Sequence, residues 1–218
     1  MTKRLQTIFE NIPPCESFAD VGCDHGFIAE QMLKSAKCSR VTVSDISLDS
    51  LNKAKKLLKK YIDQGLAFAL CTDGLKGINE NTECDLIAGM GGEEIIKILT
   101  ASVFLPKTLV LQPMKNTDKV RKALFSLGYG IEKDYIFYDK DKYYNLLVCK
   151  FNYKCEEYSE LEFVFGRDNL LNRSEDFINY LKKELQTVEG YLSKVRSAEE
   201  INTIQQKIKL LKEVFYGN

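Results

Sequence analysis

Residues 18–32, FADVGCDHGFIAEQM, place a glycine-rich turn between an apolar strand-like stretch and a helix-like stretch. A turn of this kind brings backbone N–H groups and a helix N-terminus towards a bound nucleotide. Asp24 lies inside the turn, where its carboxylate would repel the phosphates of a dinucleotide. The turn therefore favours a ligand that lacks phosphates and carries positive charge. S-adenosylmethionine (SAM), with its sulfonium and ammonium groups, meets both conditions.

Acids and glycines also follow the next three strand-like stretches. Asp45 ends the second stretch, 19 residues after Gly26, where an acid accepts the ribose hydroxyls of an adenosine. Asp73 ends the third stretch, in place to contact the adenine amine, and glycines end the fourth, where close backbone approach is needed. The predicted SAM-binding residues are Asp20, Gly22, Asp24, His25, Gly26, Asp45, Ile46, Asp73, Gly74, Ala88, Gly89, Met90 and Gly91.

These residues also have structural interpretations. Asp24 and Asp45 each precede a helix-like stretch and are able to cap it instead. NAD remains a possible ligand, although the Asp24 carboxylate would repel its phosphates. His25, the only histidine, is either a base or donor at the site, or a half-buried ring that shapes the loop. The loop-shaping role is favoured, since methylation of a purine ring nitrogen requires no deprotonation there.

Strand-like and helix-like stretches alternate through the first two thirds of the chain. The pattern predicts an α/β fold with helices on both faces of a mostly parallel sheet. A first helix over 3–12 ends at Pro13-Pro14. Two closely spaced strands then predict an antiparallel hairpin at one sheet edge. The predicted strands are 18–22, 41–46, 67–73, 85–90, 107–113, 129–139 and 142–151.

The pattern changes near residue 152, which predicts a domain over 1–152 and a helical C-terminal domain over 153–218. Apolar residues from Phe177 to Val195 and from Ile201 to Phe215 recur every three or four positions. A Ser-x-x-Glu capping box at 197–200 separates the two runs. We expect two antiparallel helices with a coiled-coil seam. Residues 151–218 carry ten basic and twelve acidic side chains, so this tail is not a basic RNA-binding arm.

Several stretches together resemble the TrmK family of bacterial tRNA (adenine-N1)-methyltransferases, which act on adenine 22 of the D-loop. They are KRLQTIFENIP, ADVGCDHGFIA, TDGL at 72–75, IAGMGGEEI at 87–95, LQPMKNTDKVRKAL at 111–124 and YYNLLVCK at 143–150. The chain lacks the Asn/Asp-Pro-Pro-aromatic turn that most other SAM enzymes acting on nitrogens carry after the fourth strand. It departs from the family at Asp45, where other members carry Glu. The resemblance implies a class I SAM-dependent methyltransferase fold, Rossmann-like, with a mostly parallel seven-stranded sheet and a C-terminal α-helical coiled-coil hairpin.

The resemblance implies transfer of the SAM methyl group to N1 of adenine 22, with tRNA as partner. Asp24, Met90 and Gln112 are the residues expected to act in catalysis, by accepting hydrogen bonds or aligning the base. Tyr144 either stacks on the base or packs on the sheet. The cluster Lys115, Lys119, Arg121 and Lys122 adjoins the expected site. The expected substrate-binding residues are Lys3, Arg4, Gln112, Pro113, Lys115, Lys119, Arg121 and Tyr144.

Composition limits the remaining functions. Lys plus Arg and Asp plus Glu are equal at 31 each, so no global field attracts a polyanion. The seven cysteines form no C-x-x-C pair, and we expect reduced thiols in a cytoplasmic protein and no metal. No signal peptide or membrane span is expected, and the chain is expected to be a monomer or weak dimer. The alternatives are a SAM enzyme acting on another RNA site or a small molecule, and a non-catalytic RNA-binding module.

Overall fold

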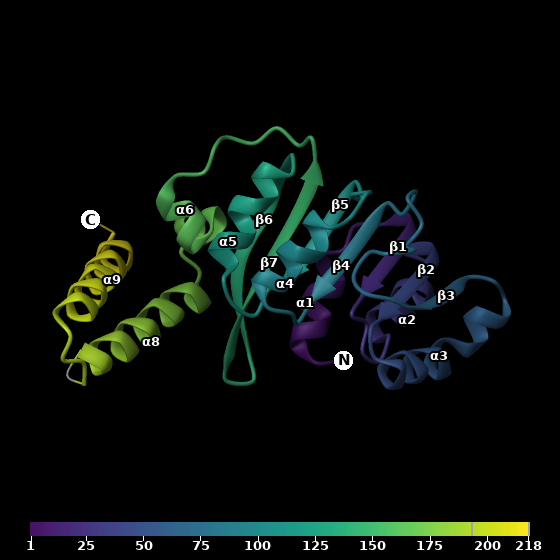
Figure 1. Ribbon diagram of the computed structural model, residues 1–218, viewed down its shortest axis with the longest axis horizontal. Helices are drawn as coiled ribbons and strands as arrows, with labels where there is room; N and C mark the ends of the chain where they lie inside the picture. The colour runs from purple at the N-terminus through teal and green to yellow at the C-terminus, as the bar shows by residue number, and fades with distance from the viewer. Residues whose placement is uncertain (193, 218) are drawn as a thin grey trace.

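The computed structural model describes residues 1–192 and 194–217. A single seven-stranded sheet with the order β3-β2-β1-β4-β5-β7-β6 forms the centre of the molecule (Figure 1). The strands are β1 (Cys15–Val21), β2 (Cys38–Asp45), β3 (Ala67–Cys71), β4 (Cys84–Ala88), β5 (Thr108–Gln112), β6 (Tyr129–Asp139) and β7 (Lys142–Phe151). The first five strands run parallel to one another, which confirms the predicted mostly parallel sheet.

The hairpin of β6 and β7 has the ends that the sequence predicts. β7 pairs antiparallel with both β5 and β6, so it lies between them and runs against the other strands. A shift of register between Ile131 and Lys133 bends β6 near its start. The hairpin therefore closes the sheet at the edge opposite β3.

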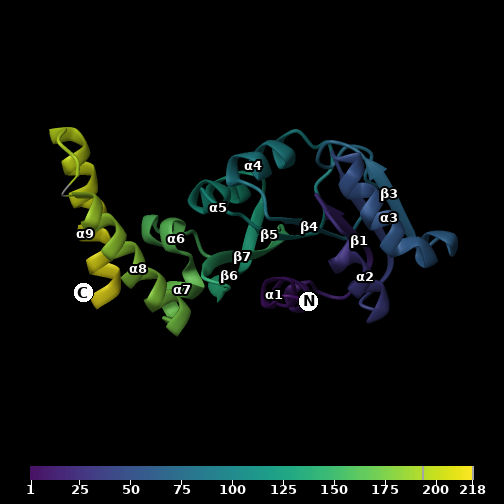
Figure 2. The ribbon, with the colours of Figure 1, turned by 90° about the horizontal axis from the view of Figure 1, so that it is seen from below.

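Helices cover both faces of the sheet (Figure 2). On one face, apolar residues of α1 (Lys3–Asn11), α2 (Phe27–Lys34) and α3 (Leu48–Asp63) pack on the strands. On the other face, α4 (Gly92–Thr100) and α5 (Thr117–Ser126) pack on a second cluster. The strands alternate their side chains between the two layers, as in Leu86 and Ile87 of β4. Among the described residues, no helix is both long and apolar enough to cross a bilayer.

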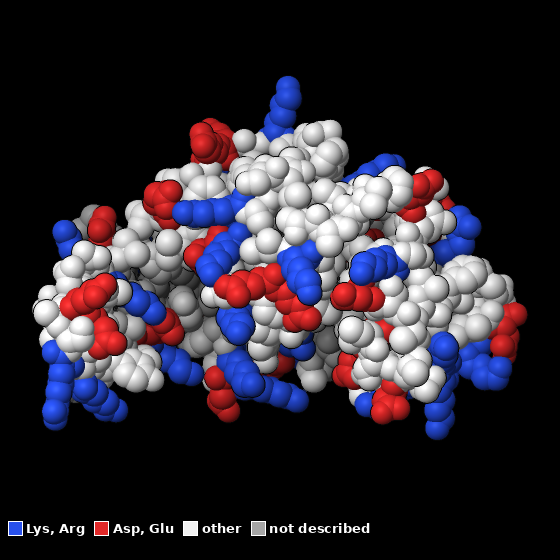
Figure 3. Space-filling model, in the orientation of Figure 1, with Lys and Arg blue, Asp and Glu red and all other residues white. Residues whose placement is uncertain are grey.

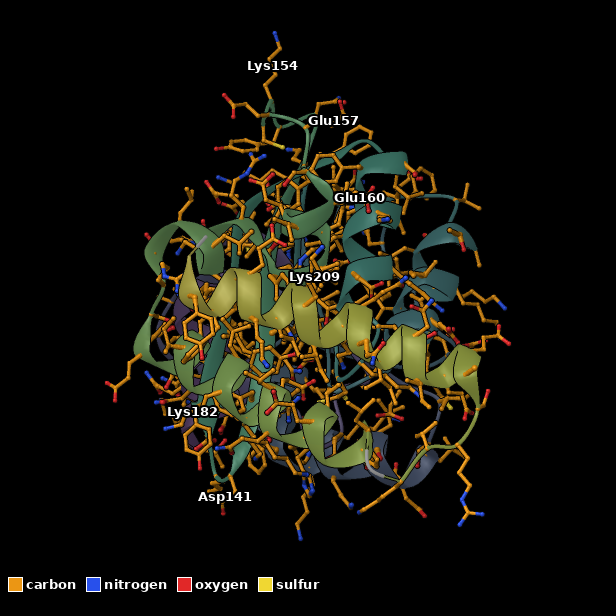
Figure 4. All side chains as sticks on the ribbon, turned by 90° about the vertical axis from the view of Figure 1, so that its left-hand side faces the viewer. Asp141, Lys154, Glu157, Glu160, Lys182 and Lys209 are labelled. Atoms are coloured by element: carbon orange, nitrogen blue, oxygen red, sulfur yellow. The ribbon has the colours of Figure 1, made fainter. Side chains whose placement is uncertain are left out.

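In the described part of the tail, four helices follow the sheet: α6 (Glu160–Phe165), α7 (Arg167–Asn172), α8 (Glu175–Leu192) and α9 (Ala198–Tyr216). Figure 4 shows α8 and α9 side by side across one end of the molecule. They share an apolar cluster that includes Leu181, Val188 and Leu211 and that extends to Ile136 of β6. The two predicted tail helices are therefore present, and their apolar seam also contacts the sheet.

Two local features of the tail differ from what the sequence predicts. The short helices α6 and α7 were not predicted, and α6 begins with a complete capping box of Ser159 and Glu162. At the predicted box, Ser197 occupies the N-cap of α9, but the structure, as described for residues 194–217, gives its side chain no capping hydrogen bond. The predicted helix start is thus correct and the predicted capping interaction is wrong.

Arg121 joins the tail to the sheet and is not a surface residue. Its Nε and Nη2 donate to the Asp134 carboxylate at 2.8 Å each, and both side chains are 1% exposed. Its Nη1 donates to the carbonyl oxygens of Phe163 and Val164 in α6, at 2.9 and 3.1 Å. The prediction that Arg121 binds tRNA is therefore wrong, since its guanidinium donors are used inside the protein.

Candidate active site

The carboxyl ends of the parallel strands meet at one edge of the sheet. Val21 of β1 lies opposite Ser44 of β2 and Ile87 of β4, and Ala88 lies opposite Gln112 of β5. The segments after these strands therefore come together, as the sequence predicts. Open α/β sheets bind their ligands at this edge, at the position where the connections from two neighbouring strands pass to opposite faces of the sheet.

The glycine turn after β1 is held in a left-handed backbone conformation. Gly22, Asp24 and Gly26 have φ of 72°, 48° and 72°. Gly26 is the N-cap of α2, so Asp24 does not cap that helix. The Asp24 side chain is 68% exposed, and its Oδ2 lies 3.7 Å from Nε2 of His25. The turn thus presents a carboxylate to the solvent side of the edge, as expected for a cationic ligand.

Asp45 connects the turn to the end of β2. Its Oδ2 accepts the N–H of Asp24 at 3.2 Å, and its Oδ1 accepts the N–H of Ser47 at 2.8 Å. Ser47, and not Asp45, is the N-cap of α3, and its hydroxyl accepts the N–H of Ser50. Each carboxylate oxygen has a second lone pair that remains able to accept a hydroxyl hydrogen.

The carboxyl group of Asp20 lies beneath the turn and is 6% exposed. Burial raises the pKa of Asp20 to about 7, the charge of Asp45 adds to this, and the N–H of Ala29 opposes it. Asp20 is therefore a carboxyl group that changes charge near neutral pH and lies next to the expected ligand. A positively charged ligand would favour its ionised form.

The turn after β4 approaches the turn after β1 closely. A Cβ atom on Gly22 would collide with Cε of Met90, so Met90 reaches across to the first turn. The Met90 carbonyl accepts the N–H of Met114 at 2.9 Å. Among the described residues, no donor reaches the carbonyl of Gly89, which is exposed. Gly89 thus offers a backbone acceptor at the opening.

Arg4 lies over this part of the edge and holds Gln112 below it. Nε of Arg4 donates to Oε1 of Gln112 at 2.6 Å, and Nε2 of Gln112 donates to the Pro113 carbonyl at 3.2 Å. Gln112 is 0% exposed. The expectation that Gln112 itself meets an incoming base is therefore wrong for this structure, because its side chain is buried and bonded to Arg4.

Arg4 is held in turn by two residues of the β6–β7 hairpin. Its backbone N–H donates to Oδ2 of Asp139 at 2.9 Å, and its guanidinium carbon lies 5.4 Å from the centre of the Tyr144 ring. Tyr144 also stacks on Phe137 at 5.6 Å, so it packs on the sheet as one interpretation proposed. Asp139 is not predicted as a site residue, because nothing local in the sequence links it to a helix 135 residues earlier.

The remaining predicted ligand contacts lie around the same edge. The His25 ring is partly exposed and stacks on Phe27 at 5.3 Å. Ile46 is 74% exposed, which leaves an apolar surface beside Asp45. Asp73 is exposed in the turn after β3, and Gly74 follows it with φ of 63°. These residues follow β1, β2 and β3, so they lie at the same edge of the sheet as the turns after β1 and β4.

The predicted basic residues differ in their surroundings. Lys3 and Lys115 are exposed, whereas Nζ of Lys119 lies 2.6 Å from Oε1 of Glu93 on α4. Lys122 pairs with Glu160 of α6. Figure 3 shows basic and acidic side chains interspersed over this face of the molecule. Of these four predicted residues, Lys3 and Lys115 have no ion-pair partner in the described part of the chain. Within residues 1–192 and 194–217, no cluster of His, Cys, Asp and Glu is suited to hold a metal ion.

A family model described as a methyltransferase domain matches residues 1–147, which include all the strand ends of the site. The chain belongs to this methyltransferase family. A curated relative, the tRNA (adenine(22)-N(1))-methyltransferase of Bacillus subtilis, is 28% identical over 230 residues, or 98% of this chain and 96% of the relative.

Solved structures resemble this methyltransferase over its whole length. A protein of the NADB-Rossmann superfamily from Streptococcus agalactiae is 27% identical, with a TM-score of 0.91 over 99% of this chain and 97% of that one. M. capricolum TrmK, solved with S-adenosyl-homocysteine, is 23% identical, with a TM-score of 0.91 over 99% and 98%. Streptococcus pneumoniae Sp1610, solved with S-adenosyl-L-methionine, is 24% identical, with a TM-score of 0.89 over 99% of both chains. The C-terminal helices therefore belong to the shared fold.

Proposed function

We propose that this methyltransferase transfers the methyl group of SAM to N1 of adenine 22 in the D-loop of tRNA. The observation that carries the proposal is the acidic turn after β1, tied to Asp45 through the N–H of Asp24. An acidic glycine turn suits a cationic cofactor and not a dinucleotide. The reaction of the Bacillus subtilis relative supplies the substrate and the position.

The cofactor is SAM, and the residues at the edge fit each part of it. The free lone pairs of Asp45 accept ribose hydroxyls, and the exposed side chain of Ile46 offers an apolar surface to the adenine ring. Asp73 is placed to accept the adenine amine, and the exposed carboxylate of Asp24 attracts the cationic end. When bound, SAM supplies an electrophilic methyl group.

The chain itself must align the target base. N1 of adenine has an in-plane lone pair, so the enzyme requires no general base and gains most from positioning N1 in line with the methyl–sulfur bond. As the N1–methyl bond forms, the methyl–sulfur bond breaks and positive charge passes from sulfur to the adenine ring. The free Gly89 carbonyl and the Asp24 carboxylate are the acceptors that stabilise this charge.

Arg4 and its partners form the entrance for the base. Gln112 accepts a hydrogen bond from the Arg4 side chain, and Asp139 of the hairpin accepts one from the Arg4 backbone N–H. The Tyr144 ring lies against the guanidinium group. We assign Gln112 a positioning part, because it reaches the base only through Arg4. Since the D-loop base is stacked in folded tRNA, it must be extruded to enter, and Arg4 is placed to meet it.

SAM affinity is expected to rise with pH between about 5.5 and 7.5, because Asp20 must be ionised to attract the cofactor. The pKa of Asp20 is raised to about 7 in the free protein. A bound cation lowers that pKa, so binding below it releases a proton. The affinity then falls by up to about tenfold for each pH unit below 7 and levels off above it. Isothermal titration calorimetry across this range measures the effect.

Two variants isolate the group responsible. Asp20→Asn is expected to remove most of the pH dependence and to bind SAM more weakly at neutral pH. His25→Gln changes the neighbouring ring of the same loop and keeps Asp20, so it is expected to keep the dependence. A slope that His25→Gln abolishes and Asp20→Asn retains would assign the titration to the histidine.

The rest of the chain is assigned to recognition of the tRNA body. Lys3 and Lys115 are exposed next to Arg4 and the turn after β5, and phosphate contacts are proposed for both and for Lys119 once it leaves Glu93. We treat 1–152 as the methyltransferase domain and 153–218 as a helical domain with a coiled-coil hairpin. A monomer or weak dimer in the cytoplasm, where tRNA matures, agrees with this role.

Mass analysis of nucleosides tests the function directly. Unmodified bacterial tRNA incubated with the protein and SAM is expected to yield 1-methyladenosine, and the same tRNA carrying guanine at position 22 is expected to yield none. Product from both tRNAs would move the target to another adenine. No methylated nucleoside, with SAM binding intact by calorimetry, would favour a small-molecule substrate or a non-catalytic RNA-binding role.

A further inference from the structure

A cavity of ≈ 690 Å³ opens on the α4 side of the sheet, next to the cofactor edge. Its walls come from residues 73–82 after β3, from the second half of α4 and from residues 101–106 after α4. Leu75, Ile98 and Phe104 give it apolar surface. A cavity of this size is typical of small-molecule sites, which combine apolar walls with a few polar groups. The proposed methyl transfer uses only Asp73 at its rim.

Asp85 is the buried polar group of this cavity. Side chains alternate along β4, and Cys84 and Leu86 belong to the layer of α1–α3, so Asp85 and Ile87 face α4. Asp85 is 2% exposed, lines the cavity, and has no hydrogen-bond partner for its Oδ1 among the described residues. A buried carboxyl oxygen without a donor is rare in folded proteins.

The other deeply buried acids have partners, whereas Oδ1 of Asp85 has none within residues 1–192 and 194–217. Asp134 is paired with Arg121, and the carboxyl of Asp20 receives the N–H of Ala29. The hydroxyl of Tyr129 is a donor in this region, but it donates to the Pro106 carbonyl. Asp85 is thus left with unused capacity to accept a hydrogen bond on the cavity side.

Charges around the cavity favour a cation. The last turn of α4 lines it, and a helix C-terminus carries partial negative charge. Lys76 and Lys97 also line it, but both are exposed and their ammonium groups are free to stay in water. Burial alone raises the pKa of Asp85 to about 8. The other charged groups that line the cavity are Asp73, Lys76, Glu80, Glu94 and Lys97. Burial raises the pKa of the Tyr129 hydroxyl, and Tyr129 lies close enough for the charge of Asp85 to raise it further.

We propose that this cavity is a second ligand site, which binds an organic ammonium or amidinium ion with an apolar body. The head donates hydrogen bonds to the Asp85 carboxylate, and the body lies against Leu75, Ile98 and Phe104. Of the residues that line the cavity, Asp73 alone is also assigned to the cofactor, and the Ile98 side chain packs against the adjacent Gly74, where a Cβ would lie 3.0 Å from it.

Benzamidinium is the probe, since it joins a planar bidentate head to an apolar ring. Titration into the ¹⁵N-labelled full chain is expected to give saturable amide shifts in residues 74–85 and 94–106, with a Kd of roughly millimolar. Asp85→Asn is expected to weaken binding at least about tenfold, because it removes the charge. Glu80→Gln, an exposed acid of the same wall, is the matched control and is expected to bind as the wild type does.

Benzamide and pH give two further readouts. Benzamide has the same shape without the charge and is expected not to bind. Binding of benzamidinium is expected to tighten from pH 7 to about 9 in the wild type as Asp85 ionises, and to change little in Asp85→Asn. Equal affinity in Asp85→Asn and wild type, shifts confined to residues 22–26 and 45–47, or the absence of saturable shifts would each overturn the proposal. The spectrum of free Asp85→Asn establishes that the variant is folded.

Discussion

Replacing Asp45 with alanine is expected to lower the affinity for SAM by about tenfold to a hundredfold. The Asp45 carboxylate accepts the N–H groups of Asp24 and Ser47. The substitution therefore removes the acceptor for the ribose hydroxyls and also the hydrogen bond that fixes the turn after β1. Hydrogen bonds to a charged group contribute about 1.5–3 kcal/mol each, and about 1.4 kcal/mol is a factor of ten in Kd. Calorimetric titration with SAM measures the loss.

Asp49 provides the matched control for Asp45. It is an exposed acid in the first turn of α3, four residues further on, and Asp49→Ala is expected to bind SAM like the wild type. Thermal unfolding of both variants separates weak binding from damage to the fold. A SAM affinity in Asp45→Ala that matches the wild type would remove Asp45 from the cofactor site.

Arg121→Met is expected to lower the free energy of unfolding by about 3–5 kcal/mol. The substitution keeps much of the side-chain volume but leaves the Asp134 carboxylate buried without its two guanidinium donors. It also leaves the carbonyl groups of Phe163 and Val164 without a donor. Urea denaturation followed by circular dichroism measures the change. The loss is expected to be seen in the sheet and in the C-terminal helices together.

A double variant and a neighbouring one test the physical cause. Arg121→Met with Asp134→Leu removes the stranded charge and is expected to recover a large part of the loss, although the hydroxyl of Tyr158 then lacks its acceptor. Lys122→Met changes an exposed residue on the same helix and is expected to shift stability by no more than about 0.5 kcal/mol. A similar loss in Lys122→Met would point to α5 itself as the sensitive element.

The sheet and its ligand-binding edge were predictable because their signals are local. Each of the first four parallel strands ends in Asp or is followed within two residues by Gly or Asp, and the predicted bounds of β6 and β7 match the structure to the residue. Once the strands are parallel, topology alone brings Asp24, Asp45 and Asp73 to one edge. The helices α8 and α9 were predictable for a similar reason, from apolar residues at helical spacing.

Contacts between distant segments were not predictable. The sequence gives Arg121 the pattern of a lysine-rich helix surface, and only the packing of α6 on α5 shows that it is buried. The position of Gln112 beneath Arg4 depends on a contact across 108 residues. The helices α6 and α7 have six residues each, too short for a periodic signal. The sequence does not show whether a charged or amide side chain faces water or a partner inside the protein.

The tie between Arg4 and the β6–β7 hairpin has a consequence for synthesis on the ribosome. The helix that carries Arg4 is made first, but its partners Gln112, Asp139 and Tyr144 emerge more than a hundred residues later. Contacts of such long sequence separation form late, because a large loop must first be closed. A nascent chain that ends before β7 already contains the acidic turn and Asp45. It can hold Arg4 in the sheet only through Gln112, because β6 with Asp139 joins the sheet through β7 and Tyr144 lies on β7 itself. The complete set of Arg4 contacts therefore arises only when the last strand enters the sheet.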